Sequence, residues 1–212
     1  MATSNPSTVV NGRRRSRRRR VIAALVRHGL TERTAHALYR LGLTLRWRML
    51  LQPDPALWVE QAGMVDAQTT GRRLGPVVRG RRDGVDIGLL VRSARGLRSA
   101  IVHTHPHSSS FSPDDADLLA KAPDVCALGA LGADGTWYIL SRAPGTPPAV
   151  KAAVDHAYWT ARQVLVPKYR ALVQAQAMTR ARVWQEHSHE IWQQIAPTLG
   201  VRYDRIEGNQ QP

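Results

Sequence analysis

The most informative stretch of this chain is Ser99-Ala100-Ile101-Val102-His103-Thr104-His105-Pro106-His107-Ser108-Ser109-Ser110-Phe111-Ser112-Pro113-Asp114-Asp115. Its apolar, partly β-branched beginning predicts a buried strand. Side chains two apart on a strand point to the same face, so His103 and His105 can offer ring nitrogens to one ion. Pro106 favours extended geometry at His105. The serine, proline and acidic residues at its end predict a helix start with Ser112 as the N-cap.

These residue types predict a metal site. Two strand histidines and a carboxylate, with water as the fourth group, form an open zinc site of the catalytic kind, and Asp114, Asp115 and Asp117 compete for the carboxylate position. Such a site supports hydrolysis of a peptide or isopeptide bond, with a nearby carboxylate as the base. Glu60 is the only glutamate between residues 32 and 186. The Ser112 hydroxyl is placed to stabilise an oxyanion, and the same residue type is explained equally well by helix capping alone.

Three short motifs resemble the pattern of the JAMM zinc metalloproteases, a family also called JAB or MPN-plus. They are Glu60-Gln61-Ala62-Gly63, His103-Thr104-His105-Pro106 and Ser112-Pro113-Asp114-Asp115. The resemblance implies zinc (Zn2+) bound by His103, His105 and Asp115, with Glu60 as the general base and Ser112 as the oxyanion donor. It also implies a JAB/MPN-like, cytidine-deaminase-like mixed sheet flanked by helices. It covers residues 43 to 142.

The loop between His105 and Ser112 has six residues, whereas the eukaryotic deubiquitinating members of that family usually have seven. The chain is more similar to shorter-looped bacterial members. The resemblance implies a protein substrate, such as a ubiquitin-like protein or a peptide, and the sequence does not select among these. The alternative is a catalytically silent JAB-like scaffold that binds a partner protein or nucleic acid.

The charge of the chain is strongly positive. Its formal net charge is +14, with 27 arginines against three lysines, and seven of the arginines lie between Arg13 and Arg20. A basic arm of this kind can bind nucleic acid through phosphate groups, although a solvated, disordered tail is the plainer expectation. The single cysteine, Cys126, excludes a disulfide framework. No apolar run approaches the ~20 residues of a membrane span, so we expect a cytoplasmic protein with no membrane partner.

The chain is expected to form one α/β or α+β domain with extensions. We predict a disordered arm over residues 1–20, a helical extension over 21–42, a metallopeptidase core over 43–147 and a C-terminal helical extension over 148–212. The N-terminal helices are expected at Val21–His28 and Glu32–Leu41, ended by Gly29 and Gly42.

Within the core, strands are predicted at Leu43–Met49, Trp58–Asp66, Arg72–Val78, Val125–Leu131 and Thr136–Ser141, with a helix at Asp86–Leu97. The last two strands are expected to form a hairpin. A long helix is predicted from Pro147 to Ala196, kinked or split at Pro167. The second His-x-His, at His187 and His189, falls on this helix, where residues two apart diverge and do not share an ion. His107 is expected to face solvent or substrate.

Overall fold

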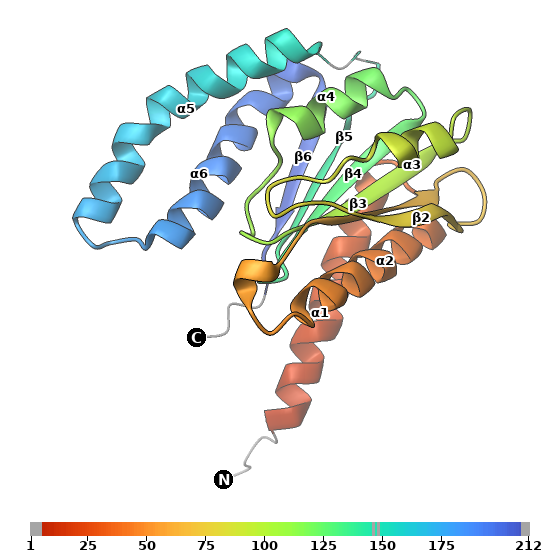
Figure 1. The fold of residues 1–212 in the computed structure, drawn as a ribbon, viewed down its shortest axis with the longest axis horizontal. Helices are drawn as coiled ribbons and strands as arrows, with labels where there is room; N and C mark the ends of the chain where they lie inside the picture. Colours follow the sequence, from red (N-terminus) through yellow and green to blue (C-terminus); the bar gives the residue numbers. More distant parts are fainter. Residues whose placement is uncertain (1–5, 146, 148, 209–212) are drawn as a thin grey trace.

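The computed structural model describes residues 6–145, 147 and 149–208, and a mixed sheet lies at its centre (Figure 1). The strands are β1 (Gln61–Asp66), β2 (Arg73–Arg79), β3 (Ser99–His105), β4 (Val125–Gly132), β5 (Trp137–Arg142) and β6 (Val201–Ile206). Their order across the sheet is β2-β1-β3-β4-β5-β6. β3 and β4 are parallel, and the other neighbouring pairs are antiparallel. The predicted mixed α/β class is therefore confirmed.

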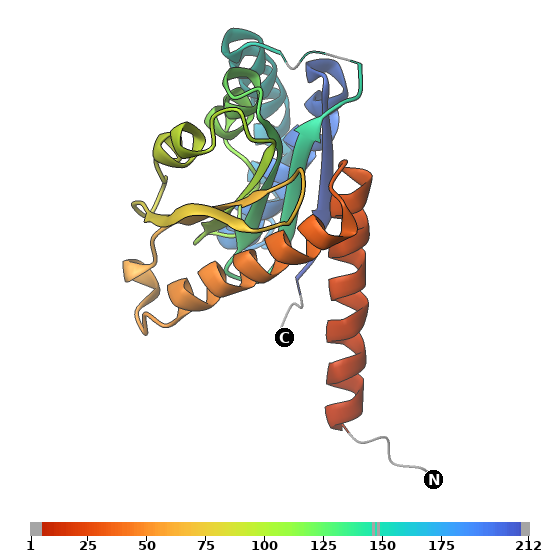
Figure 2. The ribbon, with the colours of Figure 1, turned by 90° about the vertical axis from the view of Figure 1, so that its right-hand side faces the viewer.

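Helices cover both faces of the sheet. They are α1 (Pro6–Arg27), α2 (Glu32–Leu50), α3 (Gly88–Ser93), α4 (Pro113–Lys121), α5 (Lys151–Gln174) and α6 (Arg180–Ile195), with short 3-10 helices η1 (Pro55–Leu57) and η2 (Ala196–Leu199). α1 and α2 pack on one face, whereas α4, α5 and α6 lie on the other (Figures 1 and 2). Because β3 lies in the middle of this arrangement, every residue of the strand is buried.

The alternation of side chains along β3 sorts them between two hydrophobic cores. Ala100 and Val102 join the core under α1 and α2, while Ile101 joins the core under α4, α5 and α6. His103 and His105 have the parity of Ile101, so they point to the side covered by the second group of helices. The strand therefore ends with both imidazoles on one face, as the sequence predicts.

Two further predictions are confirmed. α4 begins with Ser112 as its N-cap, and β4 and β5 form the expected antiparallel hairpin, with Gly135 in a left-handed conformation (φ 86°) in the turn. Within the described residues, no helix is both long enough and apolar enough to cross a bilayer.

The predicted strand at Leu43–Met49 is wrong, because these residues belong to α2. The buried residues of α2 include Leu38, Gly42, Leu45 and Met49, which recur at the spacing of one helix face. Gly42 does not end the helix. A Cβ added there would lie 2.5 Å from Cη2 of Trp137, so the missing side chain lets α2 pack closely on the sheet. The predicted boundary between residues 42 and 43 consequently falls inside a helix.

The predicted disorder of the arginine-rich arm is also corrected. α1 runs through the arginine run and continues to Arg27, and residues 1–5 lie outside the described residues. The second half of the helix carries Val21, Ala24 and Leu25 into the core under α2. Arginine is a good helix former, so the helix extends from this packed half into the basic segment.

The C-terminal extension is not purely helical. Residues Val201–Ile206 form β6, which pairs antiparallel with β5 at the edge of the sheet. α5 continues through Pro167, and the break before α6 falls at residues 175–179. Leu165 and Tyr169, on either side of the proline, are buried against the core, which holds the helix together there. The predicted helix at Asp86–Leu97 is limited to α3, and the strand predicted from Trp58 begins only at Gln61.

Candidate metal centre

The two histidines at the end of β3 meet through their outer ring nitrogens. Nε2 of His103 lies 2.7 Å from Nε2 of His105, and both side chains are buried. The Nδ1 of His105 donates to the carbonyl oxygen of Ser109 at 2.7 Å. That bond fixes the ring proton on Nδ1, so Nε2 of His105 is a lone-pair donor.

The backbone around Glu60 positions its carboxylate beside the histidines. The amide of Glu60 donates to the carbonyl of Arg81, its carbonyl accepts from Gly80, and the next amide, of Gln61, donates to Oγ1 of Thr104 on β3. Oε1 of Glu60 lies 3.9 Å from Nε2 of His105. One ligand atom from each of Glu60, His103 and His105 lies within 4.8 Å of the others.

Asp115 approaches the same cluster from the first turn of α4. Its Oδ1 lies 3.3 Å from Nε2 of His103. Its Oδ2 accepts from both the amide and the hydroxyl of Ser112, at 2.7 and 2.8 Å, while Oγ of Ser112 accepts from the amide of Asp115. This reciprocal capping box leaves one carboxylate oxygen directed towards the histidines. The capping role of Ser112 is thus confirmed.

The other two candidate carboxylates are engaged elsewhere. Asp114 pairs with Lys151 at 2.8 Å, and Asp117 pairs with Lys121 one helical turn along α4. The four predicted side chains Glu60, His103, His105 and Asp115 are therefore brought together. Glu60, His103 and His105 form the tightest group, and Asp115 joins it through its contact with His103.

Burial and charge set the protonation of these groups. Burial, reinforced by the charges of Asp115 and Asp83, raises the pKa of Glu60 to about 8. Burial lowers the pKa of His103, which keeps its imidazole neutral. Burial alone would raise the pKa of Asp115, but the two histidines and the hydrogen bonds from Ser112 outweigh it and lower that pKa.

The donor set could hold a divalent cation. Among the residues that the structure describes, no lysine or arginine forms an ion pair with Glu60 or Asp115, and the two carboxylates instead lie beside the imidazoles of His105 and His103. Buried carboxylates without a cationic partner are unfavourable, and a bound cation would compensate them. Imidazole nitrogen together with carboxylate oxygen is a typical ligand set of catalytic zinc.

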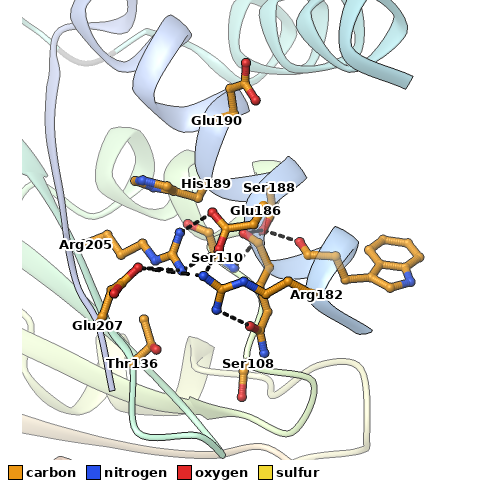
Figure 3. Close-up of polar contacts among 12 residues, drawn as sticks. Ser108, Ser110, Thr136, Arg182, Glu186, Ser188, His189, Glu190, Arg205 and Glu207 are labelled. Carbon is orange, nitrogen blue, oxygen red and sulfur yellow. Dashed lines mark hydrogen bonds and ion pairs between the residues drawn. The ribbon is translucent and has the colours of Figure 1, made fainter. Parts of the chain in front are cut away.

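The loop between the histidines and α4 is held by residues that follow the predicted core. The amide of Ser110 donates to Oγ of Ser188 on α6, and Oγ of Ser110 lies 2.9 Å from the hydroxyl of Tyr203 on β6. Nε1 of Trp192 donates to the carbonyl of Phe111. Figure 3 places Ser110 beside Ser188 on α6. These contacts surround Ser109, whose carbonyl orients His105.

Ser108 is fixed from the opposite side. It adopts a left-handed backbone conformation (φ 55°), which costs a serine some strain. Its carbonyl accepts from the hydroxyl of Tyr138 at 2.8 Å, and its Oγ accepts from the amide of Asp134 at 3.0 Å. The loop is therefore held by hydrogen bonds from β5, the turn before it, α6 and β6.

An ion-pair cluster ties α6 to β6 next to this loop (Figure 3). Arg205 donates to both carboxylate oxygens of Glu186, at 2.7 and 2.9 Å, and it lies 3.4 Å from Glu207. Arg182 pairs with the same Glu186. His189 contacts the hydroxyl of Tyr203 at 2.9 Å instead of forming a site with His187. Sequence reasoning missed Ser188, Trp192 and Tyr203, because contacts this distant in sequence leave no local pattern.

The four predicted side chains lie at a cavity of about 600 Å³, a volume typical of ligand-binding clefts. His107 lines this cavity without joining the cluster, as the sequence predicts. Trp184 of α6, with 60% of its surface exposed, forms part of the wall. Further lining residues are Arg82, Asp83, Val85 and Ile87.

Comparisons with models of protein families, with curated proteins and with solved structures give no match. The resemblance to the JAMM pattern therefore rests on the three sequence motifs alone.

Proposed function

We propose that this protein is a zinc-dependent hydrolase of peptide or isopeptide bonds, with the JAB/MPN-like fold and site of the JAMM family. The observation that carries the proposal is the meeting of four side chains from three separate segments at one cavity. Glu60 precedes β1, His103 and His105 end β3, and Asp115 begins α4. Ligand-type side chains that gather by chance on a protein surface are expected to be exposed, farther apart or paired with lysine or arginine.

In this proposal, His103, His105 and Asp115 hold the zinc ion. Nε2 of His105 and Oδ1 of Asp115 lie 2.7 and 3.3 Å from Nε2 of His103, which supports this ligand set. When bound, zinc polarises a substrate carbonyl and acidifies a water molecule. Glu60 acts as the general base. Because it is also close enough to the histidines to be a ligand, Glu60 and Asp115 are tested separately.

Glu60 takes a proton from the attacking water and gives it to the leaving amine. The water oxygen forms a bond to the carbonyl carbon, the carbon–nitrogen bond breaks, and the products are a carboxylate and an amine. A base serves best when its pKa is near the working pH, and burial brings the pKa of Glu60 to about 8 before any cation binds. A cation nearby would lower that value and favour the charged form.

Ser112 donates its hydroxyl hydrogen to Asp115 in the resting geometry. For the oxyanion role, that hydrogen has to turn from Asp115 towards the developing charge on the substrate oxygen. The backbone amide of Ser112 would then keep Oδ2 of Asp115 bonded.

The composition of the cavity walls supports a protein substrate. Apolar Val85, Ile87 and Trp184 lie beside charged Arg82 and Asp83 on its walls, which suits a segment of polypeptide with mixed side chains. The six-residue loop separates this chain from the usual deubiquitinating members, so we propose a ubiquitin-like protein or another peptide as the substrate.

The test compares zinc content and cleavage in matched variants. We expect zinc-loaded wild-type protein to cleave members of a mixed peptide library or a ubiquitin-like fusion. His103→Ala is expected to lose both zinc and cleavage, Glu60→Gln to keep zinc and lose cleavage, and His107→Ala to keep zinc. Full zinc occupancy with no cleavage of any probe would instead favour the silent scaffold.

A further inference from the structure

α1 carries an unusual concentration of positive charge. Its 22 residues include eight arginines and no acidic residue, and seven of the arginines lie between Arg13 and Arg20. At 1.5 Å of rise per residue, those seven charges occupy roughly 10 Å of helix axis. Such crowding is unfavourable for the isolated helix and favours contact with a polyanion.

The structure anchors one of these arginines and leaves its neighbours exposed. Arg17 turns inwards, where its guanidinium lies against the turn at Gly135 and its Nε and Nη2 atoms are buried. In contrast, Arg15, Arg18, Arg19 and Arg20 are exposed. Within the described residues, none of these four forms an ion pair with a carboxylate. These four arginines thus form a helical surface whose charge is not neutralised by any carboxylate of the described residues.

A groove between α1 and α2 gathers part of this charge. Arg15, Arg18 and Arg19 line a hollow of about 690 Å³ together with His36, and Nη2 of Arg18 lies 3.2 Å from Nδ1 of His36. Glu32 is the one acidic residue among the described residues that line it, and it lies 3.6 Å from His36. The hollow therefore presents guanidinium groups to solvent on one side of the helix.

The shape of α1 suits a nucleic acid. Figure 2 shows the N-terminal half of the helix projecting beyond the rest of the molecule, so an extended partner can reach it from several sides. A helix with its side chains is about 10–12 Å across, close to the ~12 Å width of the major groove of B-form DNA. Guanidinium groups also bind phosphate oxygens in a two-pronged manner.

A membrane surface is the less suitable partner. A helix that lies on a bilayer needs an apolar face opposite its basic face. Between Arg13 and Arg20 the only residue that is not arginine is Ser16, so the basic segment has no apolar side chain to insert. The apolar residues of the second half, such as Val21 and Leu25, are already buried in the core.

We propose that α1 binds the phosphodiester backbone of nucleic acid without sequence specificity. This surface lies on the α1–α2 side of the sheet, whereas His103 and His105 point to the other side, so binding does not require the metal centre or its activity. The phosphate groups that DNA and RNA have in common are the ligand, and the experiment below distinguishes DNA from RNA.

The test measures binding of the full chain to a fluorescent 30-base-pair DNA duplex and to the RNA duplex of the same sequence, across a salt series. Four phosphate contacts predict a slope of log K against log salt of about −3.6 for DNA. The triple variant Arg15→Gln, Arg18→Gln, Arg19→Gln is expected to reduce that slope by about 2.7, because three contacts are lost. A shuffled sequence should bind equally well. Equal binding of both duplexes indicates backbone recognition alone, and a preference for either identifies the source of the phosphate.

The matched control is Arg95→Gln, Arg170→Gln, Arg180→Gln, which removes the same charge from exposed positions outside α1. It should bind like the wild type. Thermal unfolding of both triple variants checks that they remain folded. Salt-independent binding, equal weakening by the control triple, or tighter binding to phosphatidylserine vesicles or to polyglutamate than to either duplex would overturn the proposal.

Discussion

The Nδ1 of His105 donates a hydrogen bond to the carbonyl oxygen of Ser109, 2.7 Å away. This contact directs the lone pair of the other ring nitrogen towards His103 and Glu60. Ser109 is held between Ser108 and Ser110, whose partners come from β5, its preceding turn, α6 and β6. The geometry of the candidate metal centre therefore depends on the C-terminal segment as much as on the strand that carries the histidines.

Removing the hydroxyl of Ser188 should weaken the centre without touching any of its side chains. Ser188→Ala leaves the buried amide of Ser110 without its partner, which costs about 1–3 kcal/mol of stability. We expect zinc affinity to fall by roughly tenfold, as is typical when a group that orients a ligand is lost. Zinc titration with a competing chelator measures this. Ser93→Ala, which removes a hydroxyl on α3, should leave the affinity unchanged, and unchanged affinity in Ser188→Ala would contradict the dependence on α6.

The two roles of Ser112 can be separated with glycine and alanine. Alanine at an N-cap costs about 1 kcal/mol, whereas glycine costs only a few tenths. Ser112→Gly should therefore unfold almost like the wild type in denaturant, while Ser112→Ala should be clearly less stable. If the hydroxyl stabilises the oxyanion, both variants lose about 100-fold or more in kcat. Full activity in Ser112→Gly would mean that Ser112 caps α4 and does not stabilise the oxyanion.

Gly42→Ala should destabilise the packing of α2 on the sheet. The added methyl would lie 2.5 Å from the indole of Trp137, a buried ring with little freedom to move. Overpacking of this kind costs about 1–3 kcal/mol, against a gain of at most about 1 kcal/mol in helix propensity. Denaturant unfolding measures the difference. Gly84→Ala is the matched control, because nothing lies within 4 Å of a Cβ at that position.

Acid should destabilise the protein through buried histidines. Burial lowers the pKa of His28, whose ring contacts Ser141 and Asp204, and burial lowers the pKa of His189 to about 4. Below the unfolded value of about 6.5, the unfolded chain takes up protons that the folded chain does not, so the free energy of unfolding falls as the pH drops. We expect this decline to run from about pH 6.5 down to about pH 4. His28→Asn should be less stable at pH 7.5 and should show a shallower decline, and an equal slope in both proteins would rule out the contribution of His28.

Local signals predicted the centre of the fold well. The apolar run before His103, the Ser-Pro-Asp-Asp start of α4 and the turn at Gly135 each specify their element within a few residues. Glu60 was predicted from the chemistry of the site and from the resemblance to the JAMM pattern, and its carboxylate lies beside the histidines in the structure. Elements set by tertiary contacts were missed.

The failures have specific physical causes. Gly42 resembles a helix end in sequence, yet it marks the position where Trp137 packs against α2. Apolar and polar residues alternate in Leu43–Met49 as they do in a strand, but the buried residues belong to a helical face that includes Leu38 and Met49. β6 follows Gly200, which ends η2 in a left-handed conformation, and its alternating Val201 and Tyr203 are the one local signal that could have revealed it.

Zinc content per chain is the most direct test of the metal centre. Protein saturated with zinc, passed through a desalting column and analysed by atomic emission should contain close to one zinc per wild-type chain and per His107→Ala chain. His105→Ala and Asp115→Asn should contain close to none, and Glu60→Gln should stay close to one. Wild-type protein without stoichiometric zinc, or full zinc retention in His105→Ala, would contradict the proposal that these side chains form a zinc site.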